Sequence, residues 1–302
     1  MASHDKHDRL RKLLRGDLDD HPSRDLRRAR TQPSDGRVDR PMRVVSLACS
    51  NTEIMDALGC AHMLVGVDDH SDFPEPLVSS LPRVGPDLSP DLDRVAGLRP
   101  DLVLATLTVP GHERVVEALR ARGLPFVAPE PVSLDDVYRD VTDIARLLGV
   151  PERGERLVAD MRRALAPTEP PPAADRPSVL VEWWPKPVIA PGRRSWVTDV
   201  LAAAGARNPL CDEDVKSRPL EDEEVRALAP DAFVLSWCGV RPEKYRPDVV
   251  YRNPAWAELP AVRDGRVFCV PEAYLGRPGP RLVDGVRALR EVVATLAAPS
   301  IS

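Results

Sequence analysis

The stretch "RVVSLACSNTEIMDALGC", residues 43–60, contains the pattern that decides the fold. Its apolar run at 44–47 predicts a buried strand. Ser50 and Glu53 have the spacing of a capping box, which predicts that a helix begins there. Gly59 suits the left-handed residue that ends such a helix. We therefore expect the chain to turn from strand to helix at "ACSNTE", and we ask what lies against that turn.

The composition limits the class of protein. A length of 302 residues predicts two lobes, and a hydrophobic share of 43% favours a globular body. The net charge is −5, with 42 basic and 47 acidic residues mixed along the chain, so no basic face for nucleic acid is expected. The five cysteines include no C-x-x-C pair, which argues against a disulfide framework and a structural zinc site.

The first residues bear on location. Residues 1–41 are strongly charged and are predicted to be a disordered extension. They lack the apolar stretch of a secretory signal, and no segment approaches the roughly 18 apolar residues of a membrane helix. We therefore expect a cytoplasmic protein. A start other than Met1, with Met42 as a candidate, leaves a periplasmic or cell-surface location as the alternative.

Strand-like and helix-like runs alternate after Met42, which predicts an α/β lobe over 42–132 with strands near 62–68, 101–107 and 124–129. A second capping box at Ser133 and Asp136 begins a helix that Gly149 ends, and Pro151 begins another that runs to Ala166. We therefore expect a helical linker over 133–177 and a second α/β lobe over 178–298.

Two segments of the chain match each other. "LDRVAGLRPDLVLA" at 92–105 and "DEEVRALAPDAFVLS" at 222–236 each predict a short helix, then Pro-Asp, then a buried strand. Asp93 and Glu223 stand at the same offset of 130 residues as Pro100 and Pro230. The match predicts two similar α/β lobes.

Ligands of open parallel sheets bind at the carboxyl ends of the strands. Four of the five tryptophans fall in the corresponding loops of the second half, at Trp183, Trp184, Trp196 and Trp237. Such rings suit a large, flat, partly apolar ligand, and the alternative is that they seal their own lobe. His70 is either a hydrogen-bonded surface residue or a cofactor contact. No residue set has metal-site spacing, and no nucleotide-binding or nucleophile motif indicates an enzyme.

Three segments together resemble a known family. They are residues 43–74, "SPDLDRVAGLRPDLVLA" at 89–105, and "NPAWAELPAVRDGRVFCVPEAYLGRPGPRLVDGVRAL" at 253–289. Over residues 42–295 the chain resembles the cobalamin and iron-siderophore substrate-binding proteins of ABC importers, most closely the cobalamin branch. The resemblance implies two Rossmann-like lobes with parallel sheets, joined by a long rigid helix, with the ligand in the cleft between them.

The resemblance also implies roles for single residues. His70 aligns with a tyrosine and Trp183 with a phenylalanine that contact the corrin, and Trp196 and Tyr274 occupy loops that face the cleft. Asp93 and Glu223 stand where one acidic residue per lobe docks onto arginines of the membrane permease. Two aromatic residues of the family's cleft are absent, because the region 85–89 and Thr106 replace them.

The leading hypothesis is a monomeric, non-enzymatic protein that captures cobalamin for ABC-type uptake or intracellular handling. Its contacts would be the side chains of His70, Trp183, Trp184, Trp196, Trp237 and Tyr274 and the amides of Ser50, Asn51 and Thr52. One alternative is a ferric siderophore or haem, which Arg193, Arg194, Arg241 and Arg277 would suit. Another is a cytoplasmic enzyme or chaperone of corrinoid metabolism on the same fold.

Overall fold

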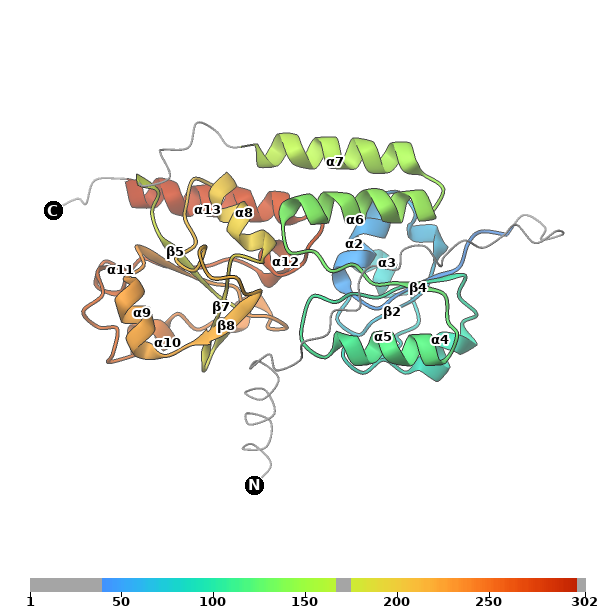
Figure 1. Ribbon diagram of the computed structural model, residues 1–302, viewed down its shortest axis with the longest axis horizontal. Coiled ribbons are helices and arrows are strands. Elements are labelled where there is room, and N and C mark those ends of the chain that lie inside the picture. Colours follow the sequence, from blue (N-terminus) through green and yellow to red (C-terminus); the bar gives the residue numbers. More distant parts are fainter. Residues whose placement is uncertain (1–39, 167–174, 298–302) are drawn as a thin grey trace, which may run out of the picture. The chain divides into compact units, whose positions relative to one another are not determined.

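The computed structural model describes residues 40–166 and 175–297 (Figure 1). The chain divides into two compact units after Glu130. Of the extension expected over 1–41, residues 1–39 lie outside the described part of the chain. Within the described part of the chain, no helix has both the length and the apolar character that crossing a bilayer requires.

Unit 1 is built on one parallel sheet with the strand order β2-β1-β3-β4. Figure 1 shows α4 and α5 on one face of this sheet and α2 on the other. The strands are β1 (Val44–Ser46), β2 (Leu64–Val67), β3 (Leu102–Leu104) and β4 (Phe126–Val127), and the helices are α2 (Cys49–Ala57), α3 (Glu75–Val78), α4 (Leu92–Gly97) and α5 (His112–Ala121).

The core of unit 1 follows from alternation along the strands. Val45 and Val103 pack with Val95 of α4 and Leu119 of α5 in one buried cluster. Each such side chain stabilises the fold by about 1.5–3 kcal/mol through the apolar area that it buries. The strands predicted from the sequence are therefore confirmed, and each ends within a few residues of its predicted position.

The start of α2 differs from the prediction. The helix begins at Cys49 with Ala48 as its N-cap, and no side chain caps it. The capping box expected at Ser50 and Glu53 is therefore wrong, because both residues already lie inside the first turns. The helix end is as predicted: Gly59 has a φ of 68°, and Cys60 N–H donates to Met55 O at 2.8 Å.

Unit 2 contains a parallel sheet in the order β10-β9-β5 and a separate antiparallel sheet in the order β6-β7-β8. The parallel strands are β5 (Val179–Glu182), β9 (Ala232–Leu235) and β10 (Val267–Cys269), and the antiparallel strands are β6 (Trp184–Pro185), β7 (Val188–Pro191) and β8 (Ser217–Leu220). The parallel sheets of both units confirm the predicted α/β class. The antiparallel sheet was not predicted.

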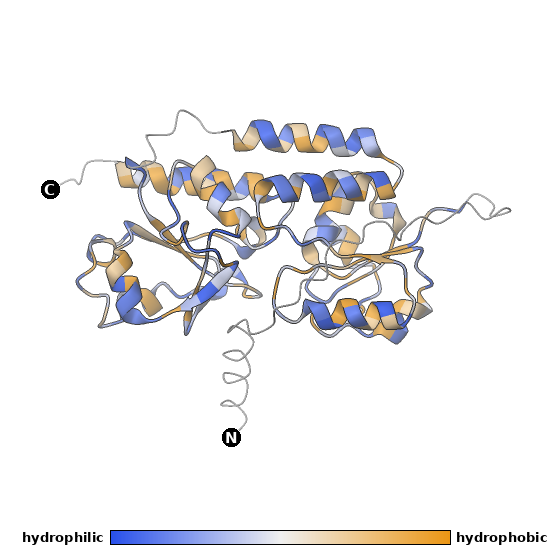
Figure 2. Ribbon diagram, in the orientation of Figure 1, coloured by the Kyte–Doolittle hydropathy of each residue, from blue (hydrophilic) through white to orange (hydrophobic). Residues whose placement is uncertain are grey.

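The helices predicted as a linker pack within unit 2. Val137 and Tyr138 of α6 (Leu134–Leu147) and Met161 of α7 (Pro151–Leu165) share a core cluster with Leu289 of α13 (Leu282–Ala297). Figure 2 shows the alternating polar and apolar residues of α6 and α7 that this packing requires. The other helices of unit 2 are α8 (Trp196–Ala203), α9 (Asp222–Leu228), α10 (Asp248–Tyr251), α11 (Pro260–Arg263) and α12 (Glu272–Leu275).

The internal repeat has a structural counterpart. Arg99 and Ala229, 130 positions apart, are the two non-glycine residues with positive φ in the described chain, at 49° and 42°. Two residues later, Asp101 accepts the backbone N–H of Arg43 at 2.9 Å, and Asp231 accepts that of Ser178 at 2.7 Å. Each acid thus joins the start of one strand, β3 in unit 1 and β9 in unit 2, to the start of the first strand of its unit, β1 or β5.

Candidate functional site

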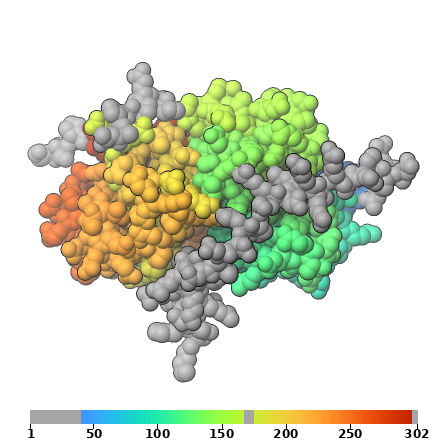
Figure 3. Space-filling view, in the orientation of Figure 1, coloured from blue at the N-terminus to red at the C-terminus, as the bar shows by residue number. Residues whose placement is uncertain are grey.

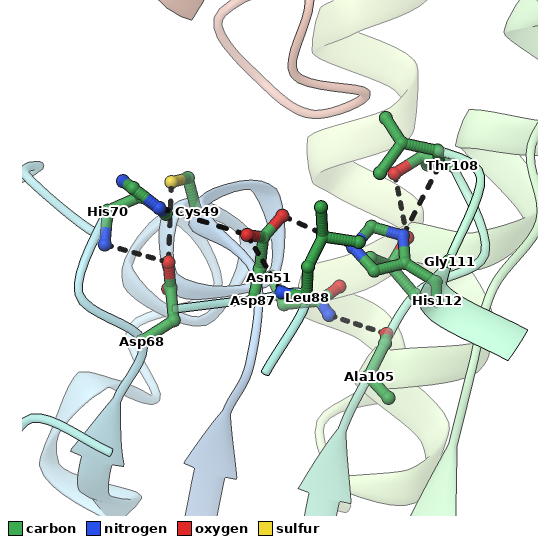
Figure 4. Close-up of polar contacts among 12 residues, drawn as sticks. Cys49, Asn51, Asp68, His70, Asp87, Leu88, Ala105, Thr108, Gly111 and His112 are labelled. Atoms are coloured by element: carbon green, nitrogen blue, oxygen red, sulfur yellow. Dashed lines mark hydrogen bonds and ion pairs between the residues drawn. The ribbon is translucent and has the colours of Figure 1, made fainter. Parts of the chain in front are cut away.

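The carboxyl ends of β1, β2 and β3 carry most of the polar side chains that unit 1 gathers at one edge of its sheet. Figure 4 shows Asp68, His70, Asp87 and His112 in this group. Asp68 and His70 directly follow β2, and His112 begins α5 after β3. Because carboxyl ends of parallel strands meet at one edge, residues from separate loops come together here.

Asp68 fixes the loop that carries His70. Its buried carboxylate accepts the hydroxyl of Ser71 and the backbone N–H of His70, the latter at 2.9 Å. Arg83 holds the same loop by donating to the carbonyls of Asp68 and Ser71 at 2.8 and 2.6 Å. Burial raises the pKa of Asp68, although these hydrogen bonds oppose the rise. The backbone position of His70 is therefore well determined.

Asp87 lies between two imidazoles. His112 Nε2 is 3.2 Å from Asp87 Oδ2, and His70 Nε2 is 3.8 Å from Oδ1. Burial alone would raise the pKa of Asp87, but the hydrogen bond from His112 and its electrostatic attraction outweigh burial and hold the pKa below its usual range. Asp87 is thus a carboxylate at neutral pH. His112 is buried, whereas the His70 side chain is 55% exposed.

The loops of this group also carry large apolar side chains that are exposed. Phe73, Leu88 and Val109 are 41%, 43% and 38% exposed, and they are three of the four large hydrophobic residues that are exposed in the described chain. They stand in the loops that carry His70, Asp87 and His112. An exposed apolar surface next to a polar side chain is typical of a ligand-binding face.

The predicted contacts at 50–52 lie in the first turns of α2. Asn51 donates its side-chain N–H to Ala105 O at 2.8 Å, and Thr52 Oγ1 donates to Ser46 Oγ at 2.9 Å. The Thr52 backbone N–H bonds to Ala48 O within the helix. Ser50 and Asn51 precede the first intrahelical bond, so their amides are the ones that a helix start offers to a ligand.

The aromatic residues of unit 2 fall into two groups. Trp183, Trp184 and Tyr274 are partly exposed, and the Arg281 guanidinium lies 4.9 Å from the Tyr274 ring centroid. Trp196 and Trp237, only 5% and 6% exposed, pack in two separate core clusters of the unit, and Trp196 donates to Leu275 O at 2.7 Å. The structure therefore gives Trp196 and Trp237 the sealing role that the sequence left as an alternative.

Trp237 and Tyr245 take part in a polar network that the sequence did not predict. Trp237 Nε1 donates to Glu182 Oε1 at 3.0 Å, and Glu272 N–H donates to Tyr245 Oη at 3.0 Å. Burial raises the pKa of Glu182 to about 7 and also raises that of Tyr245. Arg277 donates to Glu272 at 3.2 Å. Glu182 is the last residue of β5 and Tyr245 lies in the loop after β9, so their strand-end positions were the available signal.

The two predicted docking acids occupy equivalent places. Asp93 stands in the first turn of α4 and Glu223 in the first turn of α9, and both are exposed. The Asp93 side chain is 88% exposed and lies 3.4 Å from Arg122. Figure 3 shows the part of the chain that contains α9 (orange) at the molecular surface. Each acid is therefore accessible to a partner.

Among the described residues, no group of three or more His, Cys, Asp and Glu side chains forms a metal site. Among the side chains predicted to contact a ligand, His70 is exposed and Trp183, Trp184 and Tyr274 are partly exposed.

The sequence model of a family described as periplasmic binding protein matches residues 44–274 of this chain. The chain belongs to the periplasmic binding protein family. Family members that are similar to it include an uncharacterized ABC transporter substrate-binding lipoprotein of Bacillus subtilis, 28% identical over 260 residues, or 84% of this chain and 80% of the relative. The vitamin B12-binding protein of Vibrio cholerae is 27% identical over 246 residues, or 81% and 86%.

A solved structure extends this similarity. The periplasmic heme binding protein of Pseudomonas aeruginosa is 30% identical, with a TM-score of 0.70, and the match covers 87% of this chain and 96% of that one. These relatives are substrate-binding proteins rather than enzymes, which supports a non-enzymatic role at the level of the family. Substrate-binding proteins of ABC transporters bind small ligands and deliver them to permeases.

The relatives correct the expected location. The family is periplasmic by description, and the Bacillus subtilis relative is a lipoprotein. Both findings indicate a location outside the cytoplasm, so the expectation of a cytoplasmic protein is wrong. The composition of residues 1–41, on which that expectation depended, was insufficient evidence.

Proposed function

We propose that this periplasmic binding protein captures a corrinoid and delivers it to an ABC permease. The observation that carries the proposal is the edge of unit 1, where the loops that carry His70, Asp87 and His112 also carry the exposed Phe73, Leu88 and Val109. A corrin ring is broad and largely apolar, and it has a metal at its centre, so it matches a polar nitrogen set in an apolar surface. The vitamin B12-binding relative supports the same ligand class.

Unit 2 carries partly exposed aromatic residues that suit the same class of ligand. Trp183 and Trp184, which follow β5, and Tyr274, which follows β10, are partly exposed. Trp196 packs against one of them: the ring centroids of Trp183 and Trp196 are 6.3 Å apart. Aromatic faces of this kind bind a flat ligand by stacking and by apolar burial.

Haem is the second candidate. The 30% identity to a heme binding protein favours it, and haem shares the planar, metal-centred shape of a corrin. An anionic chelate is favoured less than the sequence indicated, because two of the four arginines are already paired with acids. Arg193 already pairs with Asp214 at 2.8 Å and Arg277 with Glu272 at 3.2 Å. Carboxylates of a ligand would have to compete with these two acids.

Titration of the purified protein with aquocobalamin and with ferric haem, followed by gel filtration, tests the proposal. We expect the ligand to co-elute with the protein. Replacement of Trp183 or Trp184 by alanine is expected to weaken binding about tenfold, because an aromatic contact contributes on the order of 1 kcal/mol beyond its buried area.

Tyr251→Ala is the matched control. Tyr251 is another exposed aromatic residue of unit 2, 39% exposed, but its hydroxyl donates to Gly265 O near the opposite, amino end of β10. Its loss is expected to leave binding unchanged. Absence of binding for both ligands would remove the proposed function.

A further inference from the structure

We propose that His70 coordinates the metal of the bound ligand through Nδ1, and that Asp87 and His112 are positioning residues that orient its imidazole for this bond. The inference rests on the proposed function and deepens it, because it requires the metal of the ligand to have an axial position that a histidine can occupy.

The hydrogen bonds around His112 fix the position of its proton. The backbone N–H of Val109 donates to His112 Nδ1 at 3.3 Å, so Nδ1 must carry the lone pair. Nε2 of the neutral ring therefore carries the hydrogen and donates it to Asp87 Oδ2 at 3.2 Å. The backbone N–H of Leu88 donates to Asp87 Oδ1 at 3.0 Å. Asp87 is thus held from two sides.

The second oxygen of this fixed carboxylate faces His70. Oδ1 lies 3.8 Å from His70 Nε2, which is a charge contact slightly longer than a hydrogen bond. A small rotation of the exposed ring shortens it, and such contacts tighten when the ligand arrives. Once Nε2–H donates to Asp87, the lone pair of the neutral imidazole is on Nδ1.

Nδ1 of His70 is then available as a ligand. It has no hydrogen-bond partner among the residues that the structure describes, whereas the backbone of His70 is anchored by Asp68. Metal-binding histidines usually donate their other ring N–H to a carboxylate, which fixes the tautomer and makes the imidazole a stronger donor. His70, Asp87 and His112 match this pattern, because a carboxylate stands behind the histidine that would bind the metal. Figure 4 shows the three side chains in a row.

The arrangement selects a class of ligand. One imidazole suits a metal whose equatorial positions are already filled by a macrocycle and whose axial position exchanges. Ferric haem and aquocobalamin both meet this condition. A ferric trihydroxamate does not, because its six oxygen atoms fill the coordination shell of the iron. The exposed Phe73, Leu88 and Val109 favour the macrocycle as well.

Absorbance spectra of the full chain with ferric haem and with aquocobalamin test this inference. The bands of the bound ligand are expected to shift as they do when free imidazole coordinates the same metal. His70→Ala should bind more weakly and lack the shift, and added imidazole should restore it. His62→Ala is the matched control, since His62 is an exposed histidine of the same unit, in the short helix Ala61–Met63. It should behave as the wild type.

The positioning role has its own variants. Asp87→Asn should retain the spectral shift but bind about 10–100-fold more weakly, as is usual when the carboxylate behind a metal-binding histidine is lost. Asp87→Glu, which keeps the charge, should recover part of the affinity. A purely structural role of Asp87 would instead lower the thermal stability of the free protein by the same amount in both variants.

The outcomes separate the two proposals. Binding of either macrocycle with the same spectrum in wild type and His70→Ala overturns this inference and leaves the proposed function intact. Binding of neither removes both. Tight binding of a ferric trihydroxamate in place of the macrocycles overturns the ligand class.

Discussion

Trp237 donates its indole N–H to one oxygen of the buried Glu182 at 3.0 Å, and the other oxygen, Oε2, is buried with no partner in the described chain. Ionisation of Glu182 would place a charge where a single neutral donor faces it. Burial is accordingly the main reason that its pKa is raised from 4.5 to about 7. The pair makes the stability of unit 2 depend on pH.

The pH dependence has a definite sign. Because the pKa of Glu182 is higher in the folded state, its contribution to stability is fully present below about pH 4.5 and is lost as the pH rises through about 7. Asp140, whose burial likewise raises its pKa to about 7, acts in the same direction. The Glu182 shift corresponds to about 3 kcal/mol.

Glu182→Gln removes this titration and leaves Trp237 an oxygen acceptor. The free energy of unfolding of the variant, measured in urea at pH 5 and pH 8, is expected to fall less across that interval than that of the wild type. An equal fall in both proteins would show that Glu182 is not the titrating group.

Gly154 marks a close contact between α6 and α7. A Cβ atom at this position would lie 2.5 Å from Ala145 Cβ. Gly154→Ala is therefore expected to lower the free energy of unfolding by about 1–3 kcal/mol, since the helices must separate. Gly97→Ala in α4, where a Cβ would meet nothing within 4 Å, is the control and should be neutral or raise stability by up to about 1 kcal/mol. Equal thermal midpoints for the two variants would contradict the close packing.

Asp231 joins the starts of β5 and β9 in unit 2. Asp231→Ala loses the acceptor for the Ser178 N–H and is expected to lower stability by about 1 kcal/mol. Asp231→Asn keeps a carbonyl oxygen as the acceptor and should retain most of the wild-type stability. Urea unfolding of the two variants checks the prediction. Equal free energies of unfolding for Asp231→Ala and Asp231→Asn would contradict it.

Asp93 and Glu223 are proposed to contact the permease. Asp93→Lys combined with Glu223→Lys should abolish uptake in cells while ligand affinity of the purified protein stays unchanged, because like charges brought together at an interface cost several kcal/mol. Glu117→Lys with Glu155→Lys, which reverses two exposed acids on α5 and α7, is the control and should permit uptake. Normal uptake by the first variant would remove these acids from the docking surface.

Much of the fold could be predicted from the sequence because its signals are local. Runs such as "DLVLATL" give strands, and Gly59 and Gly149 each end a helix with a positive φ. The start of α2 could not be predicted in this way. Ser50 and Glu53 satisfy the capping pattern, but the strand before them ends early and the helix begins one residue before Ser50, at Cys49.

The site was less predictable because its residues meet only in three dimensions. The sequence singled out His70 as a loop histidine. Asp87 comes from a different loop, and only the structure shows that it contacts the imidazoles of His70 and His112. Loop position also did not separate Trp183 from Trp196. Trp183 is partly exposed, whereas Trp196 begins α8 and is buried in the core.

The deep burial of Trp196, Trp237 and Trp256 divides the indole fluorescence of the protein into two populations. The three inner rings are shielded from a water-soluble quencher such as acrylamide, whereas Trp183 and Trp184 remain within its reach. A ligand that covers the outer pair should therefore protect only the quencher-accessible part of the emission, which makes that fraction, rather than total intensity, the sensitive reporter of loading.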